Sequence, residues 1–567
     1  MNILFEYIIV FLQIYIATIF ISGCGYLLKK QIFNLDEKFT FENNILWGFI
    51  LISFISLIVN FFLPLNIYVN SLIFVLLFLI ILKKKYFSQQ LKKFFKKSLI
   101  LTLLAFIFII HSNVNNPDAL LYHLPFSKIL NEHKILIGMS NIHHRFAHIS
   151  IIQYPSSSLL IYLIGKNGLL ISLSILGSSF IIYCLKEFKS LFKSKTSRVN
   201  SLIVFLILIV SIYSFSRYSN YGNDVPVHIY YYLIIIYIFK FDLDYKNNLL
   251  LKKISLLSLY AFFLKPFYVF ALFIPLILLL LNKNYKSFFK SSFFIISSIF
   301  SFAWFLKNFL ISSCLIYPIK FTCAKSISWS NPLDIKNQAL LGEVNSKSWG
   351  DRLDQSISPM EYNKNFQWLD TWVNNHLNVV LEKFVPIVIF LILLSSIFYF
   401  FKLIKNKENS HSNKKVTSII LFVSLFSSLM WFLKFPIYRY GQSYLFISFL
   451  ILFYLFVYRK IDVNKILKFK KFFNLIIILA FVGLITKNFK RISDKISDSI
   501  MPHMYDDIIH ENISQKFFNK KGIFTHYIKN DGSLCGYSIS PCSEKLDKNL
   551  NVKKIFGYKI YFIDNLN

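Results

Sequence analysis

The sequence predicts a polytopic all-α membrane protein with about fourteen transmembrane helices and a small α+β region at the C-terminal end. Of the 567 residues, 55% are hydrophobic and only 16% are charged. Apolar runs long enough to cross a bilayer recur along the whole chain. These runs are continuous and do not alternate with a period of two, so the pattern disfavours a transmembrane β-barrel.

The positive charges lie in clusters between the apolar runs, which is typical of the cytoplasmic loops of membrane proteins. The formal net charge is +34, and this distribution favours the membrane explanation over nucleic-acid binding. The strongest cluster, residues 83–97, holds seven lysines and no acidic residue. We place it in the cytoplasm, and alternation of the spans then puts the basic clusters 186–198, 402–415 and 458–471 on the same side.

Taken in order, the apolar runs define the expected spans. The first run, 3–28, carries Glu6 where a signal peptide has a basic segment, so we expect it to be retained. Run 254–282 contains Lys265-Pro266, and because proline interrupts a helix we expect two spans there. The other expected spans are 45–63, 66–82, 98–111, 155–185, 199–216, 226–241, 288–312, 382–403, 416–434, 442–458 and 472–488. In 155–185 we expect a short re-entrant piece before residues 165–168 and a full span after it.

Polar stretches between the spans divide the chain into six regions. They are N-terminal transmembrane helices (1–110), an outer loop of catalytic type (111–154), a transmembrane core (155–312), an outer loop region (313–380), C-terminal transmembrane helices (381–488) and a soluble periplasmic tail (489–567). Loop 111–154 stands out because it holds six of the twelve histidines: His111, His123, His133, His143, His144 and His148. A membrane protein that keeps so many titratable groups beside its spans usually uses some of them.

Asp118 is the candidate catalytic residue of this loop. It follows Asn116-Pro117, a pattern that suits the first turn of a helix, so a capping role is one interpretation. The other is a carboxylate at the membrane surface that acts as a base on an acceptor hydroxyl or amine, or that holds a metal. Both interpretations stay open at the level of the sequence.

The histidine cluster of the loop contains one arginine. His144 and His148 are spaced i,i+4 and would lie on one face of a helix, which makes them a weak candidate metal pair because no H-E-x-x-H frame surrounds them. Arg145 lies between them. Its planar guanidinium suits a phosphate, although an arginine here could equally anchor the loop at lipid headgroups.

Further charged side chains occur at the ends of later apolar runs. Lys265 lies between two such runs. A lysine near or within a membrane needs an anion, and a lipid phosphate is a natural partner for it. The alternative is a lysine whose side chain reaches out to the lipid headgroups. The remaining candidates in these outer turns are Arg217, Asp224, His228 and Arg439.

The six cysteines fit the same topology. Cys24 and Cys184 fall in or beside spans. Cys314 and Cys323, and Cys535 and Cys542, form close pairs in the two regions expected outside, where an oxidising compartment would allow two short disulfides. Four free thiols are the alternative.

At four places the chain resembles a family of uncharacterised bacterial multi-spanning proteins that are similar to the GT-C glycosyltransferases. The segments are 118–148, the Lys265-Pro266 step, KNFLISSCLIYP (307–318) and SLCGYSISPCSEKL (533–546). The resemblance implies a GT-C-like fold and a sugar transferase on the outer face of the bacterial inner membrane, with Asp118 in the place of the catalytic acid of the outer loop. The chain departs from the GT-C pattern because Asp118 stands without the D-x-D or D-E pair and follows about four spans rather than the first.

The resulting hypothesis is a glycosyltransferase that moves a sugar from a polyprenyl-phosphate carrier to a surface-glycan, lipid or protein acceptor. In it Asp118 is the base and His123 and Asp224 orient the substrates. Arg145, Arg217, Lys265 and Arg439 bind phosphate. No cofactor is certain, a divalent metal is possible, and no nucleic-acid partner is expected. The alternatives are a transporter or flippase, or a polymerase or ligase, for lipid-linked oligosaccharide.

Overall fold

The computed structural model describes most of the chain. The statements below exclude residues 1–2, 36–39, 85–90, 113–117, 149, 195–197, 215–220, 242–247, 282–284, 349–356, 404–413, 458–459, 463–464, 497–498, 503, 505–514, 521–522, 529–534, 544–546, 548 and 565–567.

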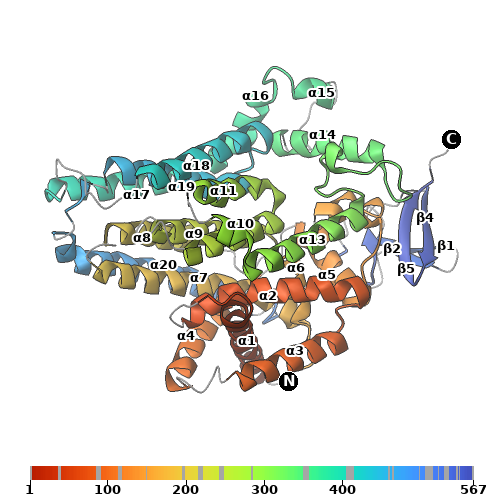
Figure 1. Ribbon diagram of the computed structural model, residues 1–567, viewed down its shortest axis with the longest axis horizontal. Coiled ribbons are helices and arrows are strands. Elements are labelled where there is room, and N and C mark those ends of the chain that lie inside the picture. The colour runs from red at the N-terminus through yellow and green to blue at the C-terminus, as the bar shows by residue number, and fades with distance from the viewer. Residues whose placement is uncertain are drawn as a thin grey trace.

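The described chain is mainly helical, and many of its long helices run along the longest axis of the molecule, whereas some of the red and orange N-terminal helices lie across it (Figure 1). The long helices are α1 (Ile3–Tyr26), α2 (Phe41–Phe62), α3 (Ile67–Lys83), α4 (Leu91–Ile109), α7 (Asn167–Lys193), α8 (Arg198–Ser214), α9 (Asp224–Phe241), α10 (Asn248–Leu264), α13 (Ser292–Ser312), α14 (Pro332–Ser348), α17 (Asn378–Phe400), α18 (Lys414–Lys434), α19 (Tyr438–Phe456) and α20 (Lys470–Asp494). The short ones are α5 (Leu124–Glu132), α6 (Gln153–Ser158), α11 (Phe273–Leu281), α12 (Tyr285–Phe289), α15 (Pro359–Tyr362) and α16 (Trp368–Trp372).

The predicted helical membrane class agrees with the structure, but the expected count of about fourteen spans is not supported. Within the described ranges, seven helical stretches are long and apolar enough to cross a membrane: Leu4–Ile32, Phe41–Phe62, Asn167–Lys193, Ser292–Ser312, Trp368–Phe400, Thr417–Lys434 and Lys465–Asp494. Three shorter apolar helices, Ile67–Lys83, Asn200–Ser214 and Pro266–Leu281, accompany them.

Two of the expected runs are interrupted, and the second of them shows why the count differs. The run 155–185 contains the expected short piece and full span, because α6 ends at Ser158 and the membrane-length helix α7 begins at Asn167. The run 254–282 breaks at Lys265, as expected, but its pieces are short: α10 has 17 residues, and the chain continues as the seven-residue 3-10 helix η5 (Pro266–Leu272) and the nine-residue α11. An apolar composition therefore does not guarantee one unbroken helix of membrane length.

Helix α9 lies at the centre of the bundle and packs against α7, α8, α10 and α19. Its residues are apolar on all sides, which is the pattern of a helix that is surrounded by other helices. Apart from Asp224, His228 and Lys240, its polar side chains are tyrosines, and the Tyr230 hydroxyl donates to the Leu46 carbonyl at 2.6 Å. This burial holds the first turn of α9, which begins at Asp224, in a constant position.

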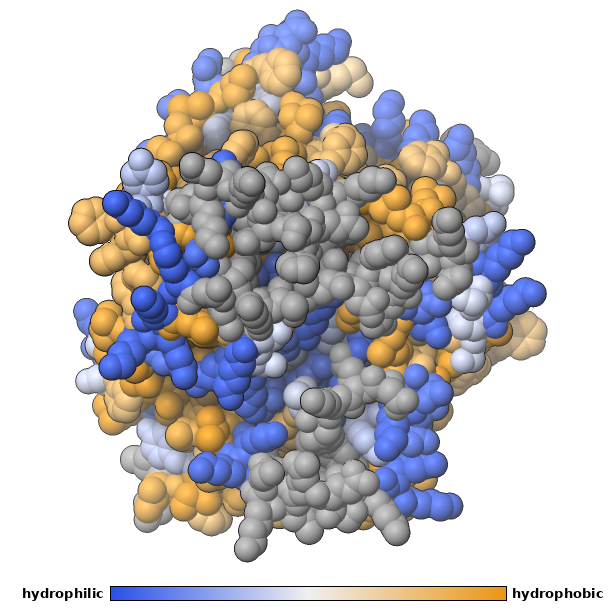
Figure 2. Space-filling view, turned by 60° about the vertical axis from the view of Figure 1, so that its left-hand side comes forward, coloured by the Kyte–Doolittle hydropathy of each residue, from blue (hydrophilic) through white to orange (hydrophobic). Residues whose placement is uncertain are grey.

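The two ends of the bundle differ. At one end α17 finishes and α20 begins, and hydrophilic side chains gather there between apolar flanks (Figure 2). The Nζ atom of Lys465 donates to the Lys402 carbonyl at 3.1 Å, so the basic clusters around residues 402 and 465 do lie side by side. The C-terminal strands lie at the opposite end (Figure 1).

The C-terminal region contains two small sheets. Strands β1 (Gln515–Lys520), β2 (Ile523–Ile528) and β3 (Cys542–Ser543) form one, in which β2 and β3 are parallel. Strands β4 (Leu550–Ile555) and β5 (Tyr558–Ile563) form an antiparallel hairpin. The Tyr561 N–H donates to the Ile137 carbonyl at 2.9 Å, so the hairpin is attached to the loop that follows α5.

The segment 118–148, which carries the predicted site, has little regular α-helix. It contains the π-helix η2 (Ala119–His123), then α5, and then the 3-10 turns η3 (Met139–Asn141) and η4 (His144–His148). π-helical turns occur frequently at functional sites, because they displace one residue from the regular helical ladder.

Candidate functional site

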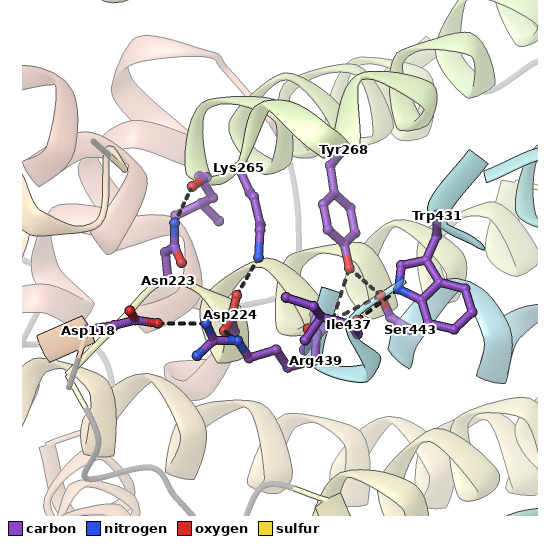
Figure 3. Close-up of polar contacts among 11 residues, drawn as sticks. Asp118, Asn223, Asp224, Lys265, Tyr268, Trp431, Ile437, Arg439 and Ser443 are labelled. Carbon is purple, nitrogen blue, oxygen red and sulfur yellow. Dashed lines mark hydrogen bonds and ion pairs between the residues drawn. The ribbon is translucent and has the colours of Figure 1, made fainter. Parts of the chain in front are cut away.

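Five charged side chains meet at the end of the bundle that carries this loop, and they alternate in sign. Arg145 Nη1 lies 2.9 Å from Asp118 Oδ1, and Arg439 Nη2 lies 2.6 Å from Asp118 Oδ2. Arg439 Nε is 3.6 Å from Asp224 Oδ2, and Lys265 Nζ is 2.5 Å from Asp224 Oδ1 (Figure 3). We call this set the charged chain. Its three cations and two carboxylates leave one net positive charge.

Each member of the charged chain lies at a helix terminus or a break. Asp118 immediately precedes η2, and Asp224 is the first residue of α9, where a carboxylate favours the positive end of the helix. Pro266 ends α10, and Lys265 before it is extended, as the residue before a proline prefers. Arg439 lies in the first turn of α19. The five side chains of the charged chain thus lie where the backbone leaves the apolar interior.

The charged chain lines a cavity of about 860 Å³. The wall of the cavity that contains the charged chain also includes His123, His144, His148 and His228. A second wall, from η5 and the end of α18, is apolar and includes Phe267, Val269, Phe270 and Met430. A third wall comes from α14 and includes the amides of Gln338 and Asn345. The cavity therefore offers an ionic end, an apolar side and a polar side to one ligand.

The ionic end has a defined protonation state near neutral pH. Burial raises the pKa of the Asp118 carboxyl, but the positive charges of Arg439 and Arg145 outweigh burial and hold that pKa below its usual value. Burial lowers the pKa of His123 to about 4, so its imidazole is neutral. Gln153 Nε2 donates to His123 Nδ1 at 2.6 Å, which leaves the proton of the neutral ring on Nε2.

The donor set suits an anion better than a metal ion. Arg439 occupies the space between the two carboxylates, where a bridging cation would otherwise bind. In the described part of the chain, no three His, Cys, Asp or Glu side chains form a group that could hold a metal.

The candidate metal pair His144 and His148 is not supported by the local geometry. These residues begin and end η4, a 3-10 helix, in which residues i and i+3 rather than i and i+4 share a face. The His144 ring instead stacks on the His143 ring, at 4.7 Å between centroids. The i,i+4 argument required an α-helix, and the chain does not form one here.

The other predicted residues are placed as follows. Arg217 lies outside the described residues. His228 is buried on α9, and its Nε2 donates to the backbone carbonyl of Arg439 at 3.0 Å, so it holds Arg439 in place. Cys314–Cys323 and Cys535–Cys542 are disulfides, whereas Cys24 and Cys184 are free and buried.

Our sequence analysis missed several residues of the site. Gln442 lies one turn after Arg439 on α19, lines the cavity and is only 9% exposed, and its side-chain N–H₂ has no acceptor in the described structure. Its i,i+3 spacing from Arg439 was the available signal. Two tyrosine rings lie against two of the three cations. Lys265 Nζ lies 3.4 Å from the centroid of the Tyr440 ring, and the guanidinium carbon of Arg145 lies 5.2 Å from the centroid of the Tyr122 ring.

The C-terminal region supports the site loop from the far side. The Gly536 N–H donates to the Leu120 carbonyl at 2.8 Å, and the Tyr537 hydroxyl donates to Asn131 Oδ1 at 2.9 Å. Both Gly536 and Tyr537 lie within the loop that the Cys535–Cys542 disulfide closes.

Comparison with known proteins gives a family but no function. No curated protein and no solved structure matches the chain. One family model, described as "Domain of unknown function (DUF8201)", matches residues 7–446, which include every member of the charged chain. Because this match covers most of the chain, the protein belongs to the DUF8201 family.

Proposed function

We propose that the protein is a membrane glycosyltransferase that moves a sugar from a polyprenyl-phosphate carrier to a surface-glycan, lipid or protein acceptor on the outer face of the bacterial inner membrane. The observation that carries this proposal is the charged chain in a cavity of a membrane-type helical bundle. It combines cations for a phosphate with a carboxylate for the acceptor.

The net charge of the site suits the donor. A sugar linked to a lipid through one phosphate is a phosphodiester with a single negative charge, and the charged chain has one net positive charge. When the sugar leaves, negative charge develops on the lipid phosphate. Preorganised cations in a site sheltered from water stabilise such charge most strongly in the transition state.

The apolar wall suits the carrier lipid. Val269 on η5 is 36% exposed, and Phe273 and Leu276 on the adjoining α11 are 45% and 52% exposed, so apolar surface continues from the cavity along the outside of this helix pair. A polyprenyl chain could lie along this surface while its phosphate reaches Lys265. Burial of its methylene and methyl groups would supply binding energy remote from the reacting bond.

Asp118 is the base in this proposal. Its carboxylate takes a proton from an acceptor hydroxyl, the acceptor oxygen bonds to the anomeric carbon, and the bond from that carbon to the phosphate oxygen breaks, with its electron pair left on the lipid phosphate. In the structure two arginines pair with Asp118 and make it a weak base. A bound phosphate would attract both arginines to itself, which weakens this pairing and strengthens the base.

One observation favours a second candidate, a flippase or transporter for lipid-linked oligosaccharide. Both oxygens of Asp118 contact arginines, so the carboxylate could serve only to position the phosphate-binding cations. A polymerase or ligase for the same carrier would differ from the proposed transferase in its acceptor.

The test is a deletion strain whose lipid-linked and surface glycans are weighed by mass spectrometry. We expect a glycan lighter by one sugar, restored by the wild-type gene and not by Asp118→Asn. Glu361→Gln, which changes an exposed acid on α15, is the matched control and should restore the glycan. Full-length glycan held on the carrier lipid would refute the transferase and support a flippase or ligase. Full restoration by Asp118→Asn would refute its role as the base.

A further inference from the structure

The tip of the β4–β5 hairpin has a residue that its turn does not favour. Ile555 pairs with Tyr558, so Phe556 and Gly557 form a two-residue turn, and both have positive φ angles of 47° and 75°. Turns of this type favour Asn-Gly, because left-handed backbone is unfavourable for a bulky side chain. Phe556 is nevertheless 96% exposed. Contacts within the described chain therefore do not explain a phenylalanine at this position.

The surroundings of Phe556 are apolar at the tip and basic behind it. Ile555 is 42% exposed. Lys553 and Lys554 precede it on β4, and Lys559 follows the turn on β5. From the loop below, Lys134 places its Nζ 3.6 Å from the centroid of the Tyr558 ring. An apolar tip with a collar of lysines is the composition of segments that insert shallowly into a membrane surface.

The position of the hairpin agrees with such a role. The Tyr558 hydroxyl donates to the carbonyl of Phe61 at 3.0 Å, in the last turn of α2, which is a candidate membrane span. At that end of α2, Phe62 and Leu63 are 66% and 51% exposed. The hairpin lies at the end of the bundle, beyond α2 and α5 (Figure 1). Its tip is thus tied to the point where a span leaves the apolar layer.

We propose that the β4–β5 hairpin is a membrane anchor: Ile555 and Phe556 insert among the lipids of the leaflet at the cavity end, and the lysine collar binds anionic headgroup phosphates. Lipid fits better than a protein partner, because a stable protein interface covers about 800 Å² on each side, more than two side chains provide. Anionic headgroups also supply the negative charge that four lysines attract. This inference does not depend on the proposed transferase activity.

The anchor would act directly on the site loop. Ile137 N–H donates to the Lys559 carbonyl at 3.1 Å, and Asn141 Nδ2 donates to the Tyr561 carbonyl at 3.1 Å. At Gly138, with a φ of 67°, an added Cβ would lie 2.1 Å from the Tyr561 carbonyl oxygen, so the loop and β5 approach very closely. Insertion of the tip would therefore set the height of the loop relative to the lipid phosphates.

The experiment measures the depth of the tip with a spin label. The full-length chain, with Cys24→Ala and Cys184→Ala so that only a new thiol reacts, carries a nitroxide at Phe556→Cys in nanodiscs of phosphatidylcholine and phosphatidylglycerol. Collision rates with oxygen, which partitions into lipid, and with a water-soluble nickel chelate report depth. Leu79→Cys on α3, where the leucine is 56% exposed, is the lipid reference. Asn337→Cys, at an exposed position on α14, is the water reference.

We expect the label at 556 to resemble the label at 79, with frequent oxygen and rare nickel collisions. Burial of a phenylalanine-sized side chain favours the inserted state by roughly thirtyfold. Lys553→Gln with Lys554→Gln, or nanodiscs of phosphatidylcholine alone, should move the label towards the water reference. Collision rates equal to those at 337 would overturn the proposal. A label shielded from both reagents would also overturn it, in favour of a second copy or another protein at the tip.

Discussion

Arg439 is the member of the charged chain whose loss should affect ligand binding most, because it alone contacts both carboxylates. Substitution Arg439→Met removes one of three cations and lowers the net charge of the site from one positive charge to none. A hydrogen bond from a charged group to phosphate contributes about 1.5–3 kcal/mol. Because the Arg439 side chain is 35% exposed, solvent screens part of this, and we take about 2 kcal/mol, or roughly thirtyfold in affinity.

The assay is a titration of the full-length chain in nanodiscs with a polyprenyl phosphate, which is the leaving group of the proposed reaction. Arg439→Lys should recover part of the affinity, since lysine keeps the charge but cannot bond to both carboxylates at once. Lys383→Met is the control, because Lys383 is an exposed cation that pairs with its neighbour Glu382. Wild-type affinity in a folded Arg439→Met variant, or an equal loss in the control, would refute the assigned role.

Three further predictions follow from the same geometry. Gln442→Leu should weaken polyprenyl-phosphate binding by roughly tenfold in the same titration, because it removes a buried donor that lacks an acceptor; unchanged affinity would exclude a contact with the ligand. Cys535→Ser with Cys542→Ser should lower the free energy of unfolding by about 2 kcal/mol, measured by denaturant titration in detergent, and no change would mean that the closed loop adds nothing. The native pKa of His123, about 4, lies below that of an unfolded histidine, so the unfolded chain binds the extra proton first as the pH falls. The contribution of His123 to the free energy of unfolding is therefore fully present above about pH 6.5 and is lost between pH 6.5 and 4. The free energy of unfolding, measured at several pH values across this range, should fall less steeply with pH for His123→Gln than for the wild type. Equal slopes would contradict the assignment.

Much of the candidate site could be predicted from single residues. Charge is expensive inside a bilayer, so an acid or a base beside an apolar run is rare enough to be noticed without a structure. That is how Asp118, Arg145, Asp224, Lys265 and Arg439 were selected. Their grouping could not be predicted, because Asp118 precedes η2 and Arg439 lies in the first turn of α19, so the two are far apart in the chain and come into contact only in the folded bundle.

The errors have equally specific causes. The pairing of His144 with His148 assumed an α-helix, whereas the segment forms a 3-10 turn, whose face repeats every three residues. The break at Lys265 was expected, but the span count assumed that the piece on each side of it is long enough to cross a membrane, whereas α10 has 17 residues and the chain beyond it forms only the 3-10 helix η5 and the nine-residue α11. Gln442 was overlooked because an amide has no charge, and its i,i+3 spacing from Arg439 gains meaning only because both residues line one cavity.

The sequence alone determined that this chain is helical, lies in a membrane and keeps ionisable groups at the ends of its apolar runs, because hydrophobic burial and the cost of charge depend on local composition. Only the tertiary structure decided which of those groups share one cavity, that Arg439 lies between two carboxylates, and that Tyr558 joins the hairpin with Phe556 at its tip to the end of α2. These features depend on contacts between residues that are distant in the chain, and such contacts are set by the packing of whole helices rather than by any local pattern of residues.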